Sequence, residues 1–238
     1  MLNNMGDYIG LSKNLIRDVE GFNSDVYKDS EGHPTIGAGL KLTDPDVRGI
    51  MNLKGIDPDE VISGNRKMNE NELDDIHTSY LPKREALIKN RIDGDLYESL
   101  PPHQKAAILS MGYQSLNNLG PKFMGRVADS DSIGAMREMI LGTNKQRDPG
   151  ILSRRFKEAE MYGGPIDFSQ TFQTFTPEEK ANLKYILDDI KNPHTKKELM
   201  DKYLPYIEGT PQQNFQKLFQ PSVQQVVPVQ PELNLKKP

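Results

Sequence analysis

The sequence contains no cysteine and no tryptophan, and its four histidines are scattered. Without cysteine the chain forms neither disulfide bonds nor thiolate metal sites. No two histidines are spaced one helical turn apart, as metal ligands on one helix face often are. We therefore expect chemistry that uses neither a metal nor a cofactor.

Long apolar runs and long basic runs are also missing. No stretch approaches the roughly 20 apolar residues that span a bilayer, and residues 1–10 lack the basic and apolar segments of a signal peptide. We expect no membrane insertion, and synthesis in a host cytoplasm without export by such signals. The formal net charge of -4 argues against a general nucleic-acid-binding protein.

Helical periodicity is the first positive signal. With 238 residues the chain is long enough for one large or two small domains. From Tyr8 to Val19, apolar residues recur at three- and four-residue steps, which predicts an amphipathic helix. Glu20 lies in its last turn, and Gly21 follows where a left-handed cap would end the helix.

The segment after this helix changes period and is rich in glycine. Asp25–Lys28 predicts a strand, the turn residues 29–34 follow, and Thr35–Leu40 predicts a returning strand. The expected element is a β-hairpin directly after the first helix.

Helical patterns dominate the middle of the chain. Helices are expected at 60–63, 132–141 and 150–162, and another helix is expected from Pro102 onward. A capping box of Asn69 and Glu72 predicts the start of a long helical segment, which Pro82 should interrupt. The helix that starts near Pro102 has little polar surface, so it should lie in the middle of a helical lobe.

A composition change near residue 165 predicts a boundary. Gly163-Gly-Pro165 and the polar stretch 167–176 indicate a linker, after which caps at Thr176 and Thr195 start two helices, the second ending near Gly209. A third short helix should begin at Thr210. We divide the chain into residues 1–165, a helical extension at 166–219 and an extended Pro- and Gln-rich tail at 220–238.

Three residues near the N-terminus form the most informative pattern. Glu20 ends a helix, Asp29 lies nine positions later at a strand end, and Thr35 lies six positions further on the returning strand. If the hairpin folds back beside the helix, all three side chains face one cleft. Two carboxylates and a hydroxyl are the groups needed to add water across a glycosidic bond.

This stretch resembles the catalytic region of bacteriophage-type lysozymes, the endolysin family typified by the lysozyme of the T-even phages (glycoside hydrolase family 24). The resemblance rests on Glu-Gly, Tyr-Lys-Asp and Gly-x-x-Thr-Ile-Gly-x-Gly at the family's spacings. It continues weakly through 105–114 and more clearly through 152–162, which is similar to the family's closing Arg-Arg-x-x-Glu helix.

The resemblance implies an α+β, lysozyme-like fold. It predicts an N-terminal helix, a small β-hairpin or sheet lobe and a mainly helical lobe, which makes 1–165 the catalytic domain. The helical C-terminal region and the extended tail are additions that have no recognised counterpart in the family.

The resemblance also implies a reaction and its residues. The protein would be a muramidase that hydrolyses the β-1,4 bond between N-acetylmuramic acid and N-acetylglucosamine of peptidoglycan, with inversion. Glu20 would be the general acid, Asp29 would orient or activate water, and Thr35 would hydrogen-bond that water. A helix C-terminus and burial both disfavour a negative charge, so we expect Glu20 to be protonated, while Asp29 in a wet turn stays ionised.

Sugar contacts are expected at Gly39, Ser110, Gln114 and Arg154. Two positions depart from the family: Leu40 replaces a frequent histidine, and Ser110 replaces an asparagine of the cleft in some members. One of Arg154 and Arg155 should pair with an acid such as Glu158, while the other either lines the cleft or is structural.

Two other functions stay open. A lytic transglycosylase uses one glutamate and forms an anhydro sugar without water, whereas Asp29 and Thr35 favour hydrolysis. A non-catalytic phage structural protein could keep a lysozyme fold, but the intact trio argues against a degenerate site.

The biological setting also has two alternatives. The protein is either an endolysin released to the periplasm or a lysozyme packaged in the phage virion. The residues after the Arg-Arg helix slightly favour the virion, because an extended tail resembles a segment that docks on virion proteins. A chain that ends at Pro165 is expected to keep its activity.

Overall fold

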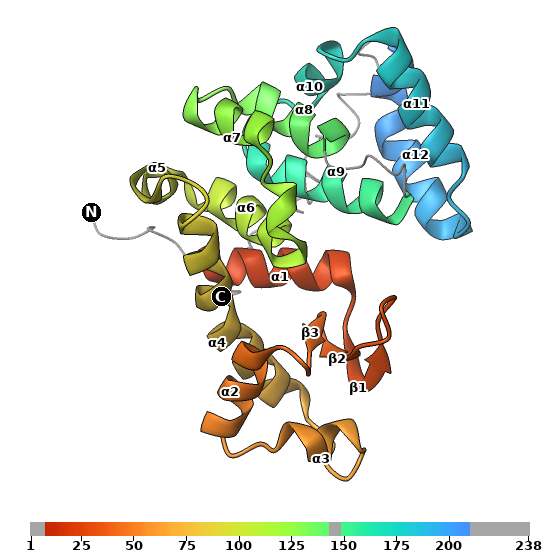
Figure 1. Cartoon of the computed structure of the whole chain (residues 1–238). Coiled ribbons are helices and arrows are strands. Elements are labelled where there is room, and N and C mark those ends of the chain that lie inside the picture. Colours follow the sequence, from red (N-terminus) through yellow and green to blue (C-terminus); the bar gives the residue numbers. More distant parts are fainter. Residues whose placement is uncertain (1–7, 143–148, 210–238) are drawn as a thin grey trace, which may run out of the picture.

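A computed structural model describes residues 8–142 and 149–209 (Figure 1). Most of these residues are helical, and a three-stranded antiparallel sheet lies near the N-terminus. The predicted α+β class is confirmed in this coarse form.

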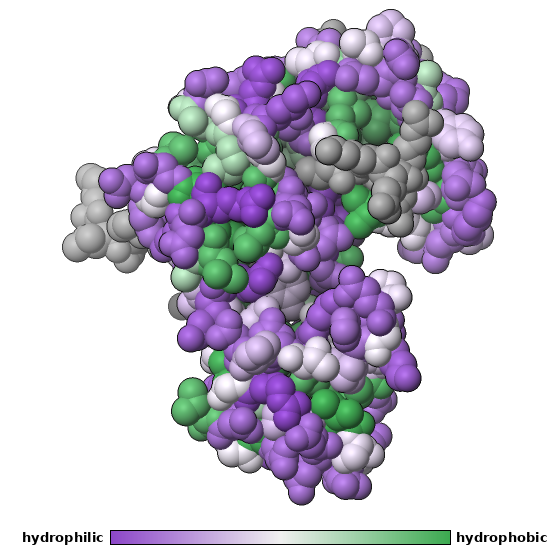
Figure 2. All heavy atoms as spheres, viewed as in Figure 1, coloured by the Kyte–Doolittle hydropathy of each residue, from purple (hydrophilic) through white to green (hydrophobic). Residues whose placement is uncertain are grey.

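The first helix, α1 (Tyr8–Glu20), lies in the middle of the molecule. In Figure 1 the sheet and the helices nearest to it in sequence lie on one side of α1, and the later helices lie on the other. The space-filling view narrows near the same level (Figure 2). The amphipathic pattern predicted this helix correctly, and Leu15 and Ile16 on its apolar face are buried. Gly21 has a φ of 75°, which confirms the left-handed cap after Glu20.

The sheet has one strand more than the predicted hairpin. Its strands are β1 (Asn23–Lys28), β2 (Pro34–Gly37) and β3 (Leu40–Lys41), paired in that order. The expected strand over 35–40 ends early because Gly37 and Gly39 have positive φ values, 65° and 82°, and turn the chain. This turn places Lys41 directly opposite Thr35.

The helices between the sheet and residue 163 follow in one series. They are α2 (Pro45–Leu53), α3 (Pro58–Ile62), α4 (Glu70–Lys89), α5 (Gly94–Ser99), α6 (Pro102–Gln114), the 3-10 turn Leu116–Asn118, α7 (Pro121–Ala128), α8 (Ser132–Gly142) and α9 (Pro149–Gly163). The capping box at Asn69 and Glu72 is confirmed. As predicted, α6 is central, and its residues 104–113 are all buried.

Pro82 does not interrupt α4, contrary to the prediction. Pro82 and Thr78, the residue whose carbonyl group loses its helical partner, are both exposed. Leu81 is fully buried beside it and packs in the core. Packing of the helix thus offsets the missing hydrogen bond.

The C-terminal helices are α10 (Ser169–Gln173), α11 (Pro177–Asp188) and α12 (Pro193–Glu208). The predicted linker over 167–176 contains α10, because Phe172 is buried there and holds the segment against the core. The capping box at Thr176 is confirmed, and so is the helix end near Gly209, which is a left-handed cap with a φ of 70°.

The cap of α12 differs from the prediction. Asn192, not Thr195, is the N-cap, and its side chain accepts hydrogen bonds from the N–H groups of His194 and Thr195. The expected helix from Thr210 and the tail at 220–238 lie outside the described residues.

Aromatic side chains join the C-terminal helices to α9. The ring of Phe156 on α9 stacks on Tyr203 of α12, with centroids 4.0 Å apart. Phe172 of α10 contacts both rings. Lys202 also forms an ion pair with Glu160 of α9 at 2.7 Å. The domain boundary near residue 165 stays a prediction. One hydrophobic core contains residues from both sides of this position.

We predict that Tyr203→Ala lowers the free energy of unfolding by about 3–5 kcal/mol, because it removes a buried ring between α9 and α12. Tyr185→Ala is the matched control, since Tyr185 on α11 is 65% exposed and its loss should change stability by about 0.5 kcal/mol or less. Urea unfolding followed by circular dichroism measures both. Equal stability of the two variants would show that the extension does not stabilise α9.

Candidate active site

Glu20 and the turn between β2 and β3 lie against each other. A Cβ atom placed on Gly39 would lie 3.7 Å from Cδ of Glu20 and 3.6 Å from the ring of Tyr113. The hydroxyl group of Tyr113 on α6 donates a hydrogen bond to the carbonyl oxygen of Ala38 at 2.8 Å. The sheet is thereby fixed beside the end of α1, and Gly39 lies next to the Glu20 carboxyl group.

One face of the sheet carries Tyr27, Thr35 and Lys41. Tyr27 and Lys41 are the cross-strand partners of Thr35 on its two sides, so these side chains share a face. Burial, followed by the negative charges of Glu20 and Asp29, raises the pKa of Tyr27. The Tyr27 hydroxyl is therefore within electrostatic reach of both predicted catalytic carboxylates.

Asp29 is held by the turn that it begins. Its Oδ1 atom accepts hydrogen bonds from the N–H groups of Glu31, at 2.9 Å, and His33, at 2.8 Å. Its Oδ2 atom lies 3.0 Å from Nζ of Lys41. Burial acts to raise the pKa of Asp29, but the hydrogen bonds from Lys41, His33 and Glu31 outweigh it and lower the pKa. These donors, more than exposure to water, keep Asp29 ionised.

Thr35 lies on β2 and is almost fully covered. Its hydroxyl group donates a hydrogen bond to the carbonyl oxygen of His33 at 3.1 Å. Because the proton is directed at His33, the lone pairs of the Thr35 oxygen remain acceptors. An oxygen in this state can accept a hydrogen bond from a water molecule.

Behind Glu20 lies a buried network of ion pairs from α9. Arg154 contacts Oε1 of Glu20 through Nη1 and Oε1 of Glu158 through Nε, the latter at 2.9 Å. Arg155 pairs with the other oxygen of Glu158, and Ser110 donates to Glu158 at 2.7 Å. Both arginines therefore pair with Glu158, whereas the sequence led us to expect only one of them to do so.

Arg154 is the group that links this network to Glu20. Burial acts to lower its pKa, but the charges of Glu158 and Glu20 outweigh burial and raise it. Glu20 itself is partly open, with 27% of its side chain exposed. The positive charge of Arg154 therefore acts on this carboxyl group in addition to the helix dipole and burial.

The predicted sugar contacts have different positions. Ser110 and Arg154 are buried and belong to the network, so neither presents a surface to a sugar. Gln114 is exposed at the end of α6, where its side-chain oxygen accepts hydrogen bonds from Arg155 and Asn118. Gly39 lies beside Glu20.

Sequence reasoning missed Tyr27 and Lys41. Tyr27 lies two residues before Asp29, and this alternation could have placed both side chains on one face of a strand. No local pattern indicated Lys41, because the turn at Gly37 and Gly39 is what brings it opposite Thr35.

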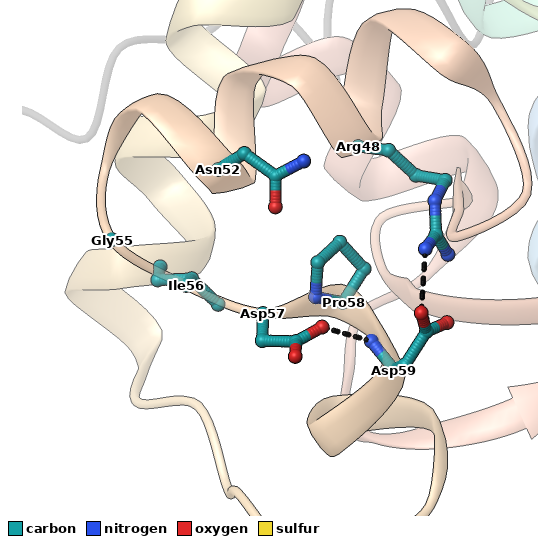
Figure 3. A pocket seen from close by; sticks show the side chains of 7 residues that line it. All are labelled: Arg48, Asn52, Gly55, Ile56, Asp57, Pro58 and Asp59. Atoms are coloured by element: carbon teal, nitrogen blue, oxygen red, sulfur yellow. Dashed lines mark hydrogen bonds and ion pairs between the residues drawn. The ribbon is translucent and has the colours of Figure 1, made fainter.

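A separate depression of about 420 Å³ lies between α2 and α3 (Figure 3). Arg48 and Asp59 form an ion pair at its edge, at 2.9 Å, and the side chain of Asp57 accepts from the N–H group of Asp59. Its acidic groups are thus already paired, and it contains no predicted catalytic residue.

Residues 8–142 and 149–209 contain no group of three or more His, Cys, Asp or Glu side chains arranged to hold a metal ion. Within the same ranges no helix has the length and hydropathy to cross a membrane.

No protein-family model matches the chain, and no curated protein matches it.

We predict that Glu158→Gln lowers the free energy of unfolding by about 3–5 kcal/mol, because it leaves two buried guanidinium groups with less than their balancing charge. Glu160→Gln is the matched control on the same helix: Glu160 pairs with Lys202 near the surface, and losing that pair should cost about 1 kcal/mol or less. Chemical denaturation compares the two variants. Similar losses would mean that Glu158 is not the centre of the network.

Proposed function

We propose that the protein is a muramidase that hydrolyses the β-1,4 bond between N-acetylmuramic acid and N-acetylglucosamine in peptidoglycan. One observation carries the proposal: the Glu20 carboxyl group, held from behind by Arg154, lies beside a sheet that holds an ionised Asp29 and the acceptor oxygen of Thr35. A lysozyme-like arrangement of the α+β fold is part of the same proposal.

Glu20 is the general acid of the proposed reaction. It donates its proton to the glycosidic oxygen as the bond to the sugar breaks, which leaves a carboxylate. Arg154 faces that carboxylate and stabilises the charge produced. Because Arg154 is also tied to Glu158 and to the carbonyl oxygen of Ser110, it does not need to reorganise during the reaction.

Asp29 and Thr35 serve the attacking water. The ionised Asp29 accepts a proton from water as the oxygen attacks the anomeric carbon, and Thr35 accepts a second hydrogen bond that orients it. The family resemblance implies that water attacks the face opposite the leaving group. The configuration at the anomeric carbon is then inverted.

The proposed setting is phage infection of a bacterium. The enzyme acts either as an endolysin in the periplasm or as a virion lysozyme, tethered to virion proteins by residues 220–238. Mass spectrometry of purified virions separates the two: full-length protein in the particles supports the tether, and its absence leaves the endolysin.

We predict that Glu20→Gln lowers the rate of peptidoglycan hydrolysis by about 10²–10⁴-fold, because the amide has no proton to donate to the leaving oxygen. Asp29→Asn should be similarly severe. Glu70→Gln is the matched control, since Glu70 forms an exposed ion pair with Arg17 and takes no part in the reaction. Turbidity of chloroform-treated Gram-negative cells measures the rates. Clearing by Glu20→Gln at the control's rate, with unchanged circular dichroism, would exclude Glu20 as the acid.

We also predict that the new reducing end appears first as the α-anomer, because inversion converts the β-linkage. Early-time proton NMR on glycan oligomers detects the anomer before it equilibrates. A β-anomer would indicate retention, and anhydro-muramic acid would indicate a lytic transglycosylase. Wall binding without any product would indicate a non-catalytic structural protein.

A further inference from the structure

Lys41 on β3 contacts two carboxyl groups of the turn between β1 and β2. Its Nζ atom lies 3.0 Å from Oδ2 of Asp29 and 2.7 Å from Oε2 of Glu31. On the strand it is paired directly with Thr35. It therefore contacts one of the two residues that are proposed to handle water and lies beside the other.

We propose that Lys41 is a positioning residue for Asp29, and that it holds the Asp29 carboxylate in the orientation that activates water. Glu31 contacts the same ammonium group and so weakens the interaction between Lys41 and Asp29. This inference rests on the proposed hydrolytic function of the site.

The hydrogen bonds explain why a third donor is needed. The N–H groups of Glu31 and His33 both donate to Oδ1 of Asp29, so they fix only one of its oxygens. Lys41 contacts Oδ2 and thereby fixes the plane of the carboxylate. Each carboxylate oxygen has two lone pairs, so Oδ2 keeps an acceptor site for the attacking water.

The charges around Asp29 set the sign of the effect. Lys41 on β3, Glu31 and His33 in the turn and Tyr27 on β1 surround it, and Glu20 on α1 acts on the same Tyr27 hydroxyl. The hydrogen bond with Glu31, followed by that with Asp29, raises the pKa of Lys41, so Lys41 remains charged wherever Asp29 titrates. Lys41 in turn helps to lower the pKa of Asp29.

Removing Lys41 should therefore move the acid side of the activity profile. Asp29 acts as a base only when ionised, and without Lys41 it takes up a proton at a higher pH. Lys41→Met is expected to shift the acid limb of the pH–kcat profile upward and to lower the plateau kcat by about threefold to tenfold, while KM changes little. Lys41→Arg, which retains the charge, should restore most of both.

Two further variants isolate the cause. Lys67→Met is the matched control, since Lys67 is 85% exposed and pairs with Asp25 at 3.4 Å in the same lobe, and it should leave the profile unchanged. Glu31→Gln removes the competing carboxylate, so its acid limb should move down or stay in place. An upward shift in both Lys41→Met and Glu31→Gln would overturn the proposal, because it would reflect loosening of the turn.

A carbon-13 NMR titration of the Asp29 carboxyl group in the full-length protein gives a readout that needs no substrate. The expected result is a higher titration midpoint in Lys41→Met than in the wild type and in Lys67→Met. An unchanged midpoint and an unchanged profile would each overturn the role of Lys41. If the wild type hydrolyses no peptidoglycan, the proposed function fails, whereas the titration still decides whether Lys41 controls Asp29.

Discussion

The carboxylate of Glu158 lies inside the protein between the guanidinium groups of Arg154 and Arg155, without contact with solvent. Charges in such a position are tolerated only when they are paired and hydrogen-bonded, since transfer of each ion from water costs several kcal/mol. Ser110 from α6 supplies a further hydrogen bond, and the carboxyl group of Glu20 from α1 contacts Arg154. The two arginines and Glu158 of α9 thus contact Glu20 of α1 and Ser110 of α6, and the positions of these three helices become interdependent.

The two proposed catalytic carboxyl groups differ because their surroundings differ. Glu20 ends a helix, faces a buried arginine and lies near Gly39. Asp29 lies in a turn, where two backbone N–H groups and the ammonium group of Lys41 favour its charged form. Environments that separate an acid from a base in this way are how one site carries out both proton transfers of a hydrolysis. Tyr113 on α6 links the helical part to the sheet, because its hydroxyl group donates a hydrogen bond to the carbonyl oxygen of Ala38 in the turn.

Local sequence patterns placed the three candidate catalytic residues on their elements. Glu20, Asp29 and Thr35 are separated by a cap, a strand and a turn, and each of these has a local signal, so the helix end, the turn and the strand that carry them could be predicted. The pairing of Arg154 with Glu158 also followed, because residues four apart on a helix are neighbours. The link between Arg154 and Glu20 did not follow, since 134 residues separate them and only the packing of α9 against α1 brings them together. For the same reason Ser110 was expected at a sugar, although it lies in the core.

The sequence by itself determined the features that depend on hydrogen bonds between near neighbours. These include the end of α1 at Gly21 and the capping boxes at Asn69 and Thr176, where a side chain and the backbone three residues away satisfy each other. Only the tertiary structure decided that α4 continues through Pro82, that α10 forms within a polar stretch and that Lys41 meets Asp29. In each of these cases the deciding energy comes from burial or ion pairing with residues distant in the chain, which outweighs the local preference and leaves no mark in the local pattern.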